Sequence, residues 1–186
     1  MFDIDRFVAD CRAALGEPTP ELAMREILER AVSRPSDLEA ALGTPRRGEI
    51  AALHRAPDLT ILNVVWTPCM SINPHNHRMW AAIGLYGGRE DNIFHRRSPE
   101  GLSLAGRREV STGEVLLLGH DVIHSVENPL RSYAGAIHIY GGDLFAPGRS
   151  EWIPGVPGEQ PFDVERARRV MAEANELWES AQPLRT

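Results

Sequence analysis

Two histidines one residue apart, in the stretch NPHNHRMWAAIGLYGG at residues 73–88, are suited to metal chemistry. His75 and His77 occupy positions i and i+2 of what looks like a strand, and such positions lie on the same face. Two imidazoles that point into one space suggest metal ligands, because imidazole is a common ligand of transition metals. The alternative is a pair that lines a buried polar pocket without a metal, and the pair alone leaves both interpretations open.

A third histidine favours the metal. In STGEVLLLGHDVIHSVEN, residues 111–128, a strand bounded by two glycines is followed by His124, with Asn128 four residues further on. Neighbouring strands lie about 5 Å apart and sequential strands usually pair, so a turn between adjacent antiparallel strands can bring His124 beside the first two histidines. We predict that His75, His77 and His124 bind one metal ion and leave coordination positions open for substrate, water or dioxygen.

His138 and Tyr140 form another i, i+2 pair, in the stretch AGAIHIY. A tyrosine hydroxyl held by an imidazole can donate a hydrogen bond to a metal-bound oxygen or to a substrate carboxylate. The alternative is a core aromatic ring whose hydroxyl is satisfied within the protein. Three other histidines are expected to be surface or hydrogen-bonded residues without a role: His54, His95 and His120.

Composition excludes several classes of function. All 20 basic residues are arginine, so the chain has no amine side chain for a Schiff base and no lysine for a phosphate-binding P-loop. The net charge of -6 and the scattered arginines make nucleic acid an unsuitable partner. With 186 residues and 42% hydrophobic content, the chain is expected to form one domain.

The N-terminus MFDIDRF lacks the pattern of a secretory signal, and no apolar run approaches the roughly 18 residues of a membrane span. We therefore expect a soluble, cytoplasmic protein with no membrane partner. Cys11 and Cys69 are too few for a disulfide framework, and each is expected to be a small buried apolar group.

Helices are predicted first along the chain. Apolar residues at spacings of three and four indicate helices in DIDRFVADCRAAL, residues 3–15, and in TPELAMREILERAV, residues 19–32. A third, shorter helix is expected from Ser36 or Asp37 to Gly43. These helices make up an N-terminal extension over about residues 1–45.

Strands follow. Eight short runs rich in Val, Ile, Leu and aromatic residues, separated by glycine or proline, predict a β-sandwich or barrel over about residues 48–141. Residues 142–186 are expected to form a glycine- and proline-rich loop up to Gln160 and a last helix in DVERARRVMAEANELWES. The last helix is expected to cover either the mouth of the barrel or a partner subunit of a homodimer.

The order HxH, apolar strand, glycine and Gx5GxDxxHxxxN resembles the two sequence motifs of the cupin superfamily. This resemblance implies a mainly β fold, the cupin double-stranded β-helix or jelly roll, here with N-terminal helices and a C-terminal helix. Over about the first three-quarters of the chain, the sequence is similar to the cysteine dioxygenase group of thiol dioxygenases. That group binds Fe(II) with three histidines and lacks the glutamate ligand of most cupins, and Ala81 and Ala82 stand at the corresponding positions.

Further segments carry the resemblance. HSVEN, from His124 to Asn128, is similar to an HRVEN element of thiol dioxygenases, and Ala136, His138 and Tyr140 correspond to their SxHxY segment. Because Ala136 replaces the serine, the hydrogen-bond relay is expected to be shorter and Tyr140 less tightly oriented. Because Ala82 replaces the cysteine that cross-links to the tyrosine in animal enzymes, Tyr140 is expected to be a free phenol in a bacterial-type enzyme.

The resemblance also implies a clamp for the substrate carboxylate, since thiol dioxygenases that act on amino or mercapto acids use an arginine on an early strand. The nearest candidate is Arg55, whose planar guanidinium suits two parallel hydrogen bonds to a carboxylate. Arg46, Arg47 and Arg78 are alternative candidates, and an exposed arginine beside the turn RAPD needs no functional explanation.

Together these observations predict an Fe(II)-dependent dioxygenase that converts a small thiol, of the cysteine or mercapto-acid type, to its sulfinate with O2. A second hypothesis is a cupin hydrolase or isomerase that uses Zn or Mn as a Lewis acid, and by ligand type Ni also suits such a site. A third is a non-enzymatic cupin that binds a small ligand as a sensor. The catalytic residues expected for the first hypothesis are Tyr140 and His138.

Overall fold

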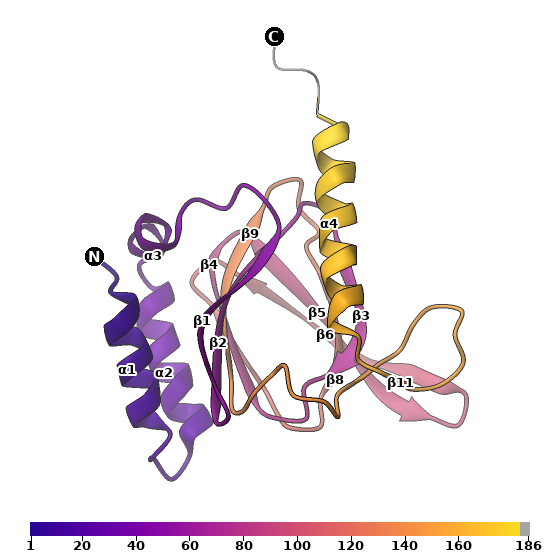
Figure 1. Cartoon of the computed structure of the whole chain (residues 1–186), viewed down its shortest axis with the longest axis horizontal. Coiled ribbons are helices and arrows are strands. Elements are labelled where there is room, and N and C mark those ends of the chain that lie inside the picture. Colours follow the sequence, from indigo (N-terminus) through magenta and orange to yellow (C-terminus); the bar gives the residue numbers. More distant parts are fainter. Residues whose placement is uncertain (183–186) are drawn as a thin grey trace.

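Two antiparallel β-sheets face each other, with three helices against the outside of one sheet and a fourth helix beside the opening between the sheets (Figure 1). This computed structural model describes residues 1–182. The helices are α1 (Ile4–Ala14), α2 (Pro20–Val32), α3 (Pro35–Leu42) and α4 (Val164–Ser180). The strands are β1 (Glu49–Ala56), β2 (Leu59–Trp66), β3 (Ser71–Asn76), β4 (Ala81–Gly87), β5 (Arg89–Ser98), β6 (Gly101–Ser111), β7 (Val115–Leu118), β8 (Ile123–Glu127), β9 (Ala134–Tyr140), β10 (Ser150–Glu151) and β11 (Gln160–Pro161).

The strand order defines a double-stranded β-helix. The inner sheet has the order β1-β2-β9-β4-β7, and the outer sheet has the order β11-β10-β3-β8-β5-β6. From β2 to β5 and again from β6 to β9, the chain crosses from one sheet to the other at every connection, which is the arrangement of a jelly roll. The predicted mainly β fold with helices at both ends is therefore confirmed.

The inner sheet is buried on both faces, which explains the continuous apolar sequence of β2. Leu59 and Ile61 face the core formed with α1, α2 and α3, while Leu62 and Val64 face the space between the two sheets. Every residue of β2 is buried. A strand covered on both faces loses the alternation of apolar and polar residues that marks a half-exposed strand.

Helix α2 approaches the inner sheet most closely at Gly84 of β4. A Cβ atom at this position would lie 2.6 Å from Cγ of Leu28, so only glycine leaves room for the helix. Leu28 and its neighbour Val32 are fully buried against the sheet. The N-terminal helices therefore cover the face of the inner sheet opposite the candidate site.

The apolar run after the histidines forms its own strand: β3 ends at Asn76 and β4 begins at Ala81, with Arg78 at a φ of 58° in the turn between them. One expectation about strands is wrong. The strand that contains His124 does not pair with the strand before it: β7 lies in the inner sheet, and β8 pairs with β3 and β5 in the outer sheet. From β6 to β9 consecutive strands belong to opposite sheets, so β8 cannot pair with β7.

The segment predicted as a loop after about residue 142 contains two short strands. β10 pairs with β3, where Glu151 lies opposite His75, and with β11. Strands of two residues among glycines and prolines leave no periodic pattern in the sequence, so the prediction missed them. The predicted C-terminal helix is present as α4, and residues 183–186 lie outside the described part of the chain.

Cys11 is buried, as predicted, but Cys69 is exposed. Cys69 lies in the turn between β2 and β3 with a φ of 59°, so its side chain belongs to a surface turn rather than to a core element. No helix within residues 1–182 combines the length and the apolar character needed to cross a membrane.

Asn175 attaches α4 to the start of the β-body. Its side-chain Oδ1 accepts hydrogen bonds from the Gly48 N–H at 2.8 Å and from the Thr67 hydroxyl at 2.7 Å, and its Nδ2 donates to the Gly48 carbonyl at 2.9 Å. A Cβ atom at Gly48 would collide with Thr67 and with Met171, so the glycine permits this close approach. The C-terminal helix thus lies beside the opening between the sheets, where Met171 and Asn175 line the cavity described below.

We predict that Asn175→Ala lowers the free energy of unfolding by about 1–3 kcal/mol, because it leaves the buried Gly48 and Thr67 groups without partners. Chemical denaturation followed by tryptophan fluorescence measures this change. Glu176→Ala is the matched control on the exposed face of the same helix and is expected to change stability by no more than about 0.5 kcal/mol. Equal effects of the two substitutions would contradict the proposed anchoring.

Candidate metal centre

The pairing of β3 with β8 brings the three predicted histidines together. His75 lies directly opposite His124 in the antiparallel register, and His77 follows one residue after the end of β3. The Nε2 atom of His77 lies 3.2 Å from Nε2 of His75 and 3.3 Å from Nε2 of His124. Among residues 1–182, this is the group of histidine, cysteine and acidic side chains whose spacing could hold a metal ion.

Hydrogen bonds at the other ring nitrogens set the tautomers of two of these histidines. Nδ1 of His75 lies 2.9 Å from the Asn73 carbonyl, which can only accept, so Nδ1 carries the proton. Nδ1 of His124 lies 2.7 Å from Oδ1 of Asn92, whose amide nitrogen donates to Glu90. Both histidines therefore present an unprotonated Nε2 to the centre of the group.

Burial keeps these imidazoles neutral. The pKa of His75 is lowered to about 4, mainly because burial disfavours the charged ring. Burial also lowers the pKa values of His77 and His124 well below the usual value, and the neighbouring histidines lower them further. Neutral imidazole is the form that binds metals, so the group is ready to accept a cation without losing protons.

The spacing of the nitrogens fits one metal ion. With metal–nitrogen bonds of about 2.0–2.1 Å, two ligands are about 3.0 Å apart at a right angle and about 3.4 Å apart at a tetrahedral angle. The observed separations of 3.2 and 3.3 Å lie between these values. Nitrogen lone pairs that converge repel one another unless a proton or a cation lies between them. The three imidazole nitrogens therefore suit a transition metal ion that they coordinate from one face.

His138 and Tyr140 lie beside this group on β9 of the inner sheet. Nδ1 of His138 is 2.9 Å from the Tyr140 hydroxyl, and the rings of Tyr140 and His77 have centroids 5.0 Å apart. Burial raises the pKa of Tyr140 above its usual value, so the side chain is a neutral phenol. Ala82 pairs with Ile139 in the register of β4 with β9, and the pattern of the two cores places it on the helix-covered face, away from Tyr140.

The relay beyond His138 is not shortened by Ala136, contrary to expectation. Nε2 of His138 lies 3.2 Å from Oε2 of Glu90, a fully buried carboxylate that also accepts from Nε1 of Trp66 at 2.6 Å. Burial opposes ionisation of Glu90, but the nearby His138 and the hydrogen bonds from His138, Asn92 and Trp66 together lower its pKa. The hydrogen-bond relay thus runs from Tyr140 through His138 to Glu90, a carboxylate on β5.

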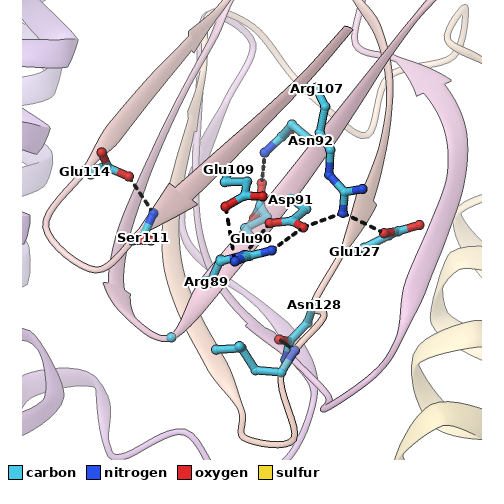
Figure 2. A network of polar contacts seen from close by, with 12 residues as sticks. Arg89, Glu90, Asp91, Asn92, Arg107, Glu109, Ser111, Glu114, Glu127 and Asn128 are labelled. Carbon is cyan, nitrogen blue, oxygen red and sulfur yellow. Dashed lines mark hydrogen bonds and ion pairs between the residues drawn. The ribbon is translucent and has the colours of Figure 1, made fainter. Parts of the chain in front are cut away.

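Strand β5 supplies both of the partner residues that sequence reasoning missed (Figure 2). Glu90 and Asn92 are joined by a hydrogen bond of 2.9 Å. Glu90 also contacts His138, and Asn92 contacts His124. Arg89 and Asp91 alternate with them and form an ion-pair network with Arg107 on the other face of the outer sheet. The sequence REDN, residues 89–92, indicates that alternate side chains lie on opposite faces of a strand. Only the pairing of β5 with β8 shows that the face with Glu90 and Asn92 points toward the histidines.

Arg55 lies at the edge of a cavity of about 570 Å³ that the three histidines also line. Its Nε and one terminal nitrogen each donate to the Asp143 carboxylate at 2.9 Å, and its side chain is 52% exposed. A second arginine, Arg149, lines the same cavity and is 8% exposed. Arg149 lies in the segment predicted as a loop, where no periodic pattern marks a buried residue.

The remaining histidines lie outside the group. His95 is 3.1 Å from the Ser125 hydroxyl, and His120 is exposed beside Asp121, as expected of hydrogen-bonded or surface residues. His54 differs, because its Nε2 is buried and makes no hydrogen bond with the described residues.

No known protein family model matches the chain. Its fold is similar to that of a Bacillus halodurans protein (15% identity, 76% of this chain and 89% of that chain, TM-score 0.48). It is also similar to an uncharacterised Klebsiella pneumoniae protein with a double-stranded β-helix domain (10% identity, 58% and 81%, TM-score 0.46). A third similar structure is an RmlC-like cupin family protein from Methanocaldococcus jannaschii (8% identity, 54% and 84%, TM-score 0.44). At these TM-scores the likenesses add nothing to the strand order, which defines the fold by itself.

We predict that His77→Ala and His124→Ala each abolish tight metal binding, because two imidazoles cannot complete the site. The measurement is metal content per chain after anaerobic reconstitution with Fe(II) and gel filtration. His95→Ala, a half-buried histidine on neighbouring β5, is the control and should retain the full content. Full metal occupancy in His77→Ala would refute the assignment of the ligands.

Proposed function

We propose that this protein is a mononuclear non-haem iron dioxygenase of the cupin type that converts a thiol to its sulfinate. The observation that carries this proposal is the convergence of three neutral imidazoles, without a carboxylate ligand among the described residues, beside a buried tyrosine. The resemblance of the histidine motifs and of the HSVEN and AGAIHIY segments to thiol dioxygenases supports the choice of iron and of a thiol. The proposed ligands are His75, His77 and His124.

Bound Fe(II) would supply the chemistry that the side chains lack, by deprotonating the thiol and activating dioxygen. In the overall reaction, a thiolate and O2 give a sulfinate, so both oxygen atoms form bonds to sulfur. The electrons that sulfur loses reduce the two oxygen atoms, and the thiol proton is released. The reaction therefore needs no external reductant, which agrees with the proposed single metal ion and its small set of protein groups.

Tyr140 and His138 would control one proton beside the reacting groups. Because ionised Glu90 accepts from Nε2–H of His138, an unprotonated Nδ1 would accept a hydrogen bond from the Tyr140 hydroxyl. A proton on Nδ1 reverses that hydrogen bond, since Nδ1–H then donates to the phenol oxygen and frees the Tyr140 O–H to donate into the cavity. The relay can thus place a hydrogen-bond donor or an acceptor at the same point, next to His77.

The walls of the cavity would exclude water from the reaction. Leu62, Val64 and Trp66 of β2 line one side, and Val126 of β8 lines the other. An apolar lining strengthens the electrostatic interactions within the site and limits side reactions of the activated groups.

Dioxygen uptake distinguishes the proposed iron dioxygenase from an enzyme that uses zinc or manganese as a Lewis acid. The Fe(II)-reconstituted protein is expected to consume one molecule of O2 for each thiol and to yield the sulfinate, measured with an oxygen electrode and by mass spectrometry. The Zn(II)-loaded protein is the control and should consume none. If no thiol in a panel of cysteine, cysteamine and mercapto acids stimulates uptake, a hydrolase, an isomerase or a ligand sensor becomes the better assignment.

We predict that Glu90→Gln lowers kcat about 10- to 100-fold and leaves metal content and the KM for the thiol nearly unchanged, because Glu90 positions His138 rather than the substrate. Steady-state kinetics and metal analysis of the same sample measure these three quantities. Glu109→Gln, which removes an exposed carboxylate from β6, is the control. A change in KM alone would place Glu90 outside the relay.

A further inference from the structure

The cavity is larger than a cysteine-sized thiol requires. Its volume of about 570 Å³ lies within the range of roughly 300–1,000 Å³ typical of pockets for drug-sized ligands. It extends from the three histidines to α4 and to Ile50 of β1, an apolar side chain that is 41% exposed. A small thiol bound at the histidines would fill only the inner end of this space.

The outer part of the cavity is apolar where α4 covers it. Val164, Ala167 and Met171 line it from the helix, while Leu144 and Phe145 line it from the segment after β9. The arginines near this outer part already have partners, since Arg47 pairs with Glu179 and Arg168 pairs with Glu165. This part of the cavity therefore suits a hydrocarbon body rather than a second charged group.

The inner end contains a buried cation. Arg149 is 8% exposed, its Nε atom is buried without a hydrogen-bond partner, and it forms no ion pair with any residue from 1 to 182. Its guanidinium lies 4.0 Å from the centroid of the Phe162 ring, and that ring lies 5.6 Å from the ring of His75. The cation is thus held beside the candidate metal ligands by β10 and β11, which begin and end next to Arg149 and Phe162.

No carboxylate among residues 1–182 forms an ion pair with Arg149. Asp143 is bound by Arg55 through two hydrogen bonds, and Glu151 is bound by Arg166 at 3.2 Å. A buried charge without a partner costs free energy, and an anionic ligand in the cavity removes that cost.

We propose that the ligand of this cavity is a mercapto acid with an apolar chain, whose carboxylate binds Arg149 and whose chain lies against α4. The thiol group of this ligand is inferred from the proposed function. The carboxylate and the apolar chain are inferred from the residues that line the cavity. Because Arg149 and the histidines line the same end of the cavity, the thiol and the carboxylate belong at the same end of the chain, as in a 2-mercaptoalkanoate. The chain then points from the inner end toward Ile50.

Ligands without a thiol bind but cannot react, so their affinities test the proposed roles of the carboxylate and of the apolar chain. The measurement is calorimetry on the metal-loaded protein under argon, with decanoate, propionate and decanol as probes. Decanoate is expected to bind at least 100-fold more tightly than propionate, since each buried methylene raises the affinity by a factor of about four. Arg149→Gln should weaken decanoate at least tenfold while decanol still binds, which shows that the cavity is intact. Arg108→Gln is the control for loss of a positive charge, because Arg108 is exposed on β6 and does not line the cavity.

Several results would overturn the inference. If decanoate binds no more tightly than propionate, the apolar chain is wrong, and if Arg55→Gln rather than Arg149→Gln weakens decanoate, Arg55 is the clamp. A second variant, Ala167→Phe, fills the outer part and should remove the advantage of decanoate over propionate. In oxygen uptake, kcat/KM should be at least tenfold higher for 2-mercaptodecanoate than for 2-mercaptopropionate. Oxygen uptake with short thiols alone would support the proposed dioxygenase activity and contradict the apolar chain of the ligand. Decanoate binding without oxygen uptake by any thiol would contradict the dioxygenase activity and support the proposed cavity ligand.

Discussion

The register in which β3 pairs with β8 is the constraint on which the candidate site depends. It sets His75 directly across from His124, so their side chains share the space between the sheets. A shift of one residue would turn one of the two side chains to the opposite face of the outer sheet. The buried strands of both sheets and the closed order of the jelly roll hold this register, and the hydrogen bonds at Asn73 and Asn92 then orient the two rings.

A second group of buried polar residues continues this arrangement. Glu90 accepts hydrogen bonds from Trp66, Asn92 and His138, which belong to three different strands. A buried carboxylate is stable only when several donors surround it, and removal of one donor leaves the others poorly satisfied. Glu90 therefore links the orientation of His124, through Asn92, to that of Tyr140, through His138. One carboxylate connects both sides of the site.

The sequence predicted the groups whose spacing is local. The i, i+2 pairs His75/His77 and His138/Tyr140 lie together as their spacing indicates, and the continuous apolar runs became the strands of the buried sheet. The jelly roll itself was accessible through the motif around His124. The two pairs depend on the alternation of side chains along one strand, which is visible in a single sequence, whereas the jelly roll was predicted from the resemblance to the cupin motifs.

Features that depend on contacts between distant strands were not predictable. Glu90 and Asn92 contact the histidines because β5 pairs with β8, and Arg149 is buried because β10 pairs with β3. No short-range pattern shows which of these residues meet the site, since Glu90, Asp91 and Asn92 are all fully buried. The partner of Arg55, Asp143, was equally inaccessible, because the two residues are 88 positions apart.

The two ends of the cavity come from different kinds of structure. Strands and their register build the inner end with the histidines, whereas one helix near the C-terminus, attached through Asn175 to Gly48 and Thr67, forms much of the outer wall. Substitutions on the cavity-facing side of α4 can therefore change the size and shape of an acceptable ligand without disturbing the residues that would hold the metal. In relatives with the same inner end, differences in ligand preference would then arise by divergence of this single helix, and exchange of its cavity-facing residues offers a direct route to altered selectivity.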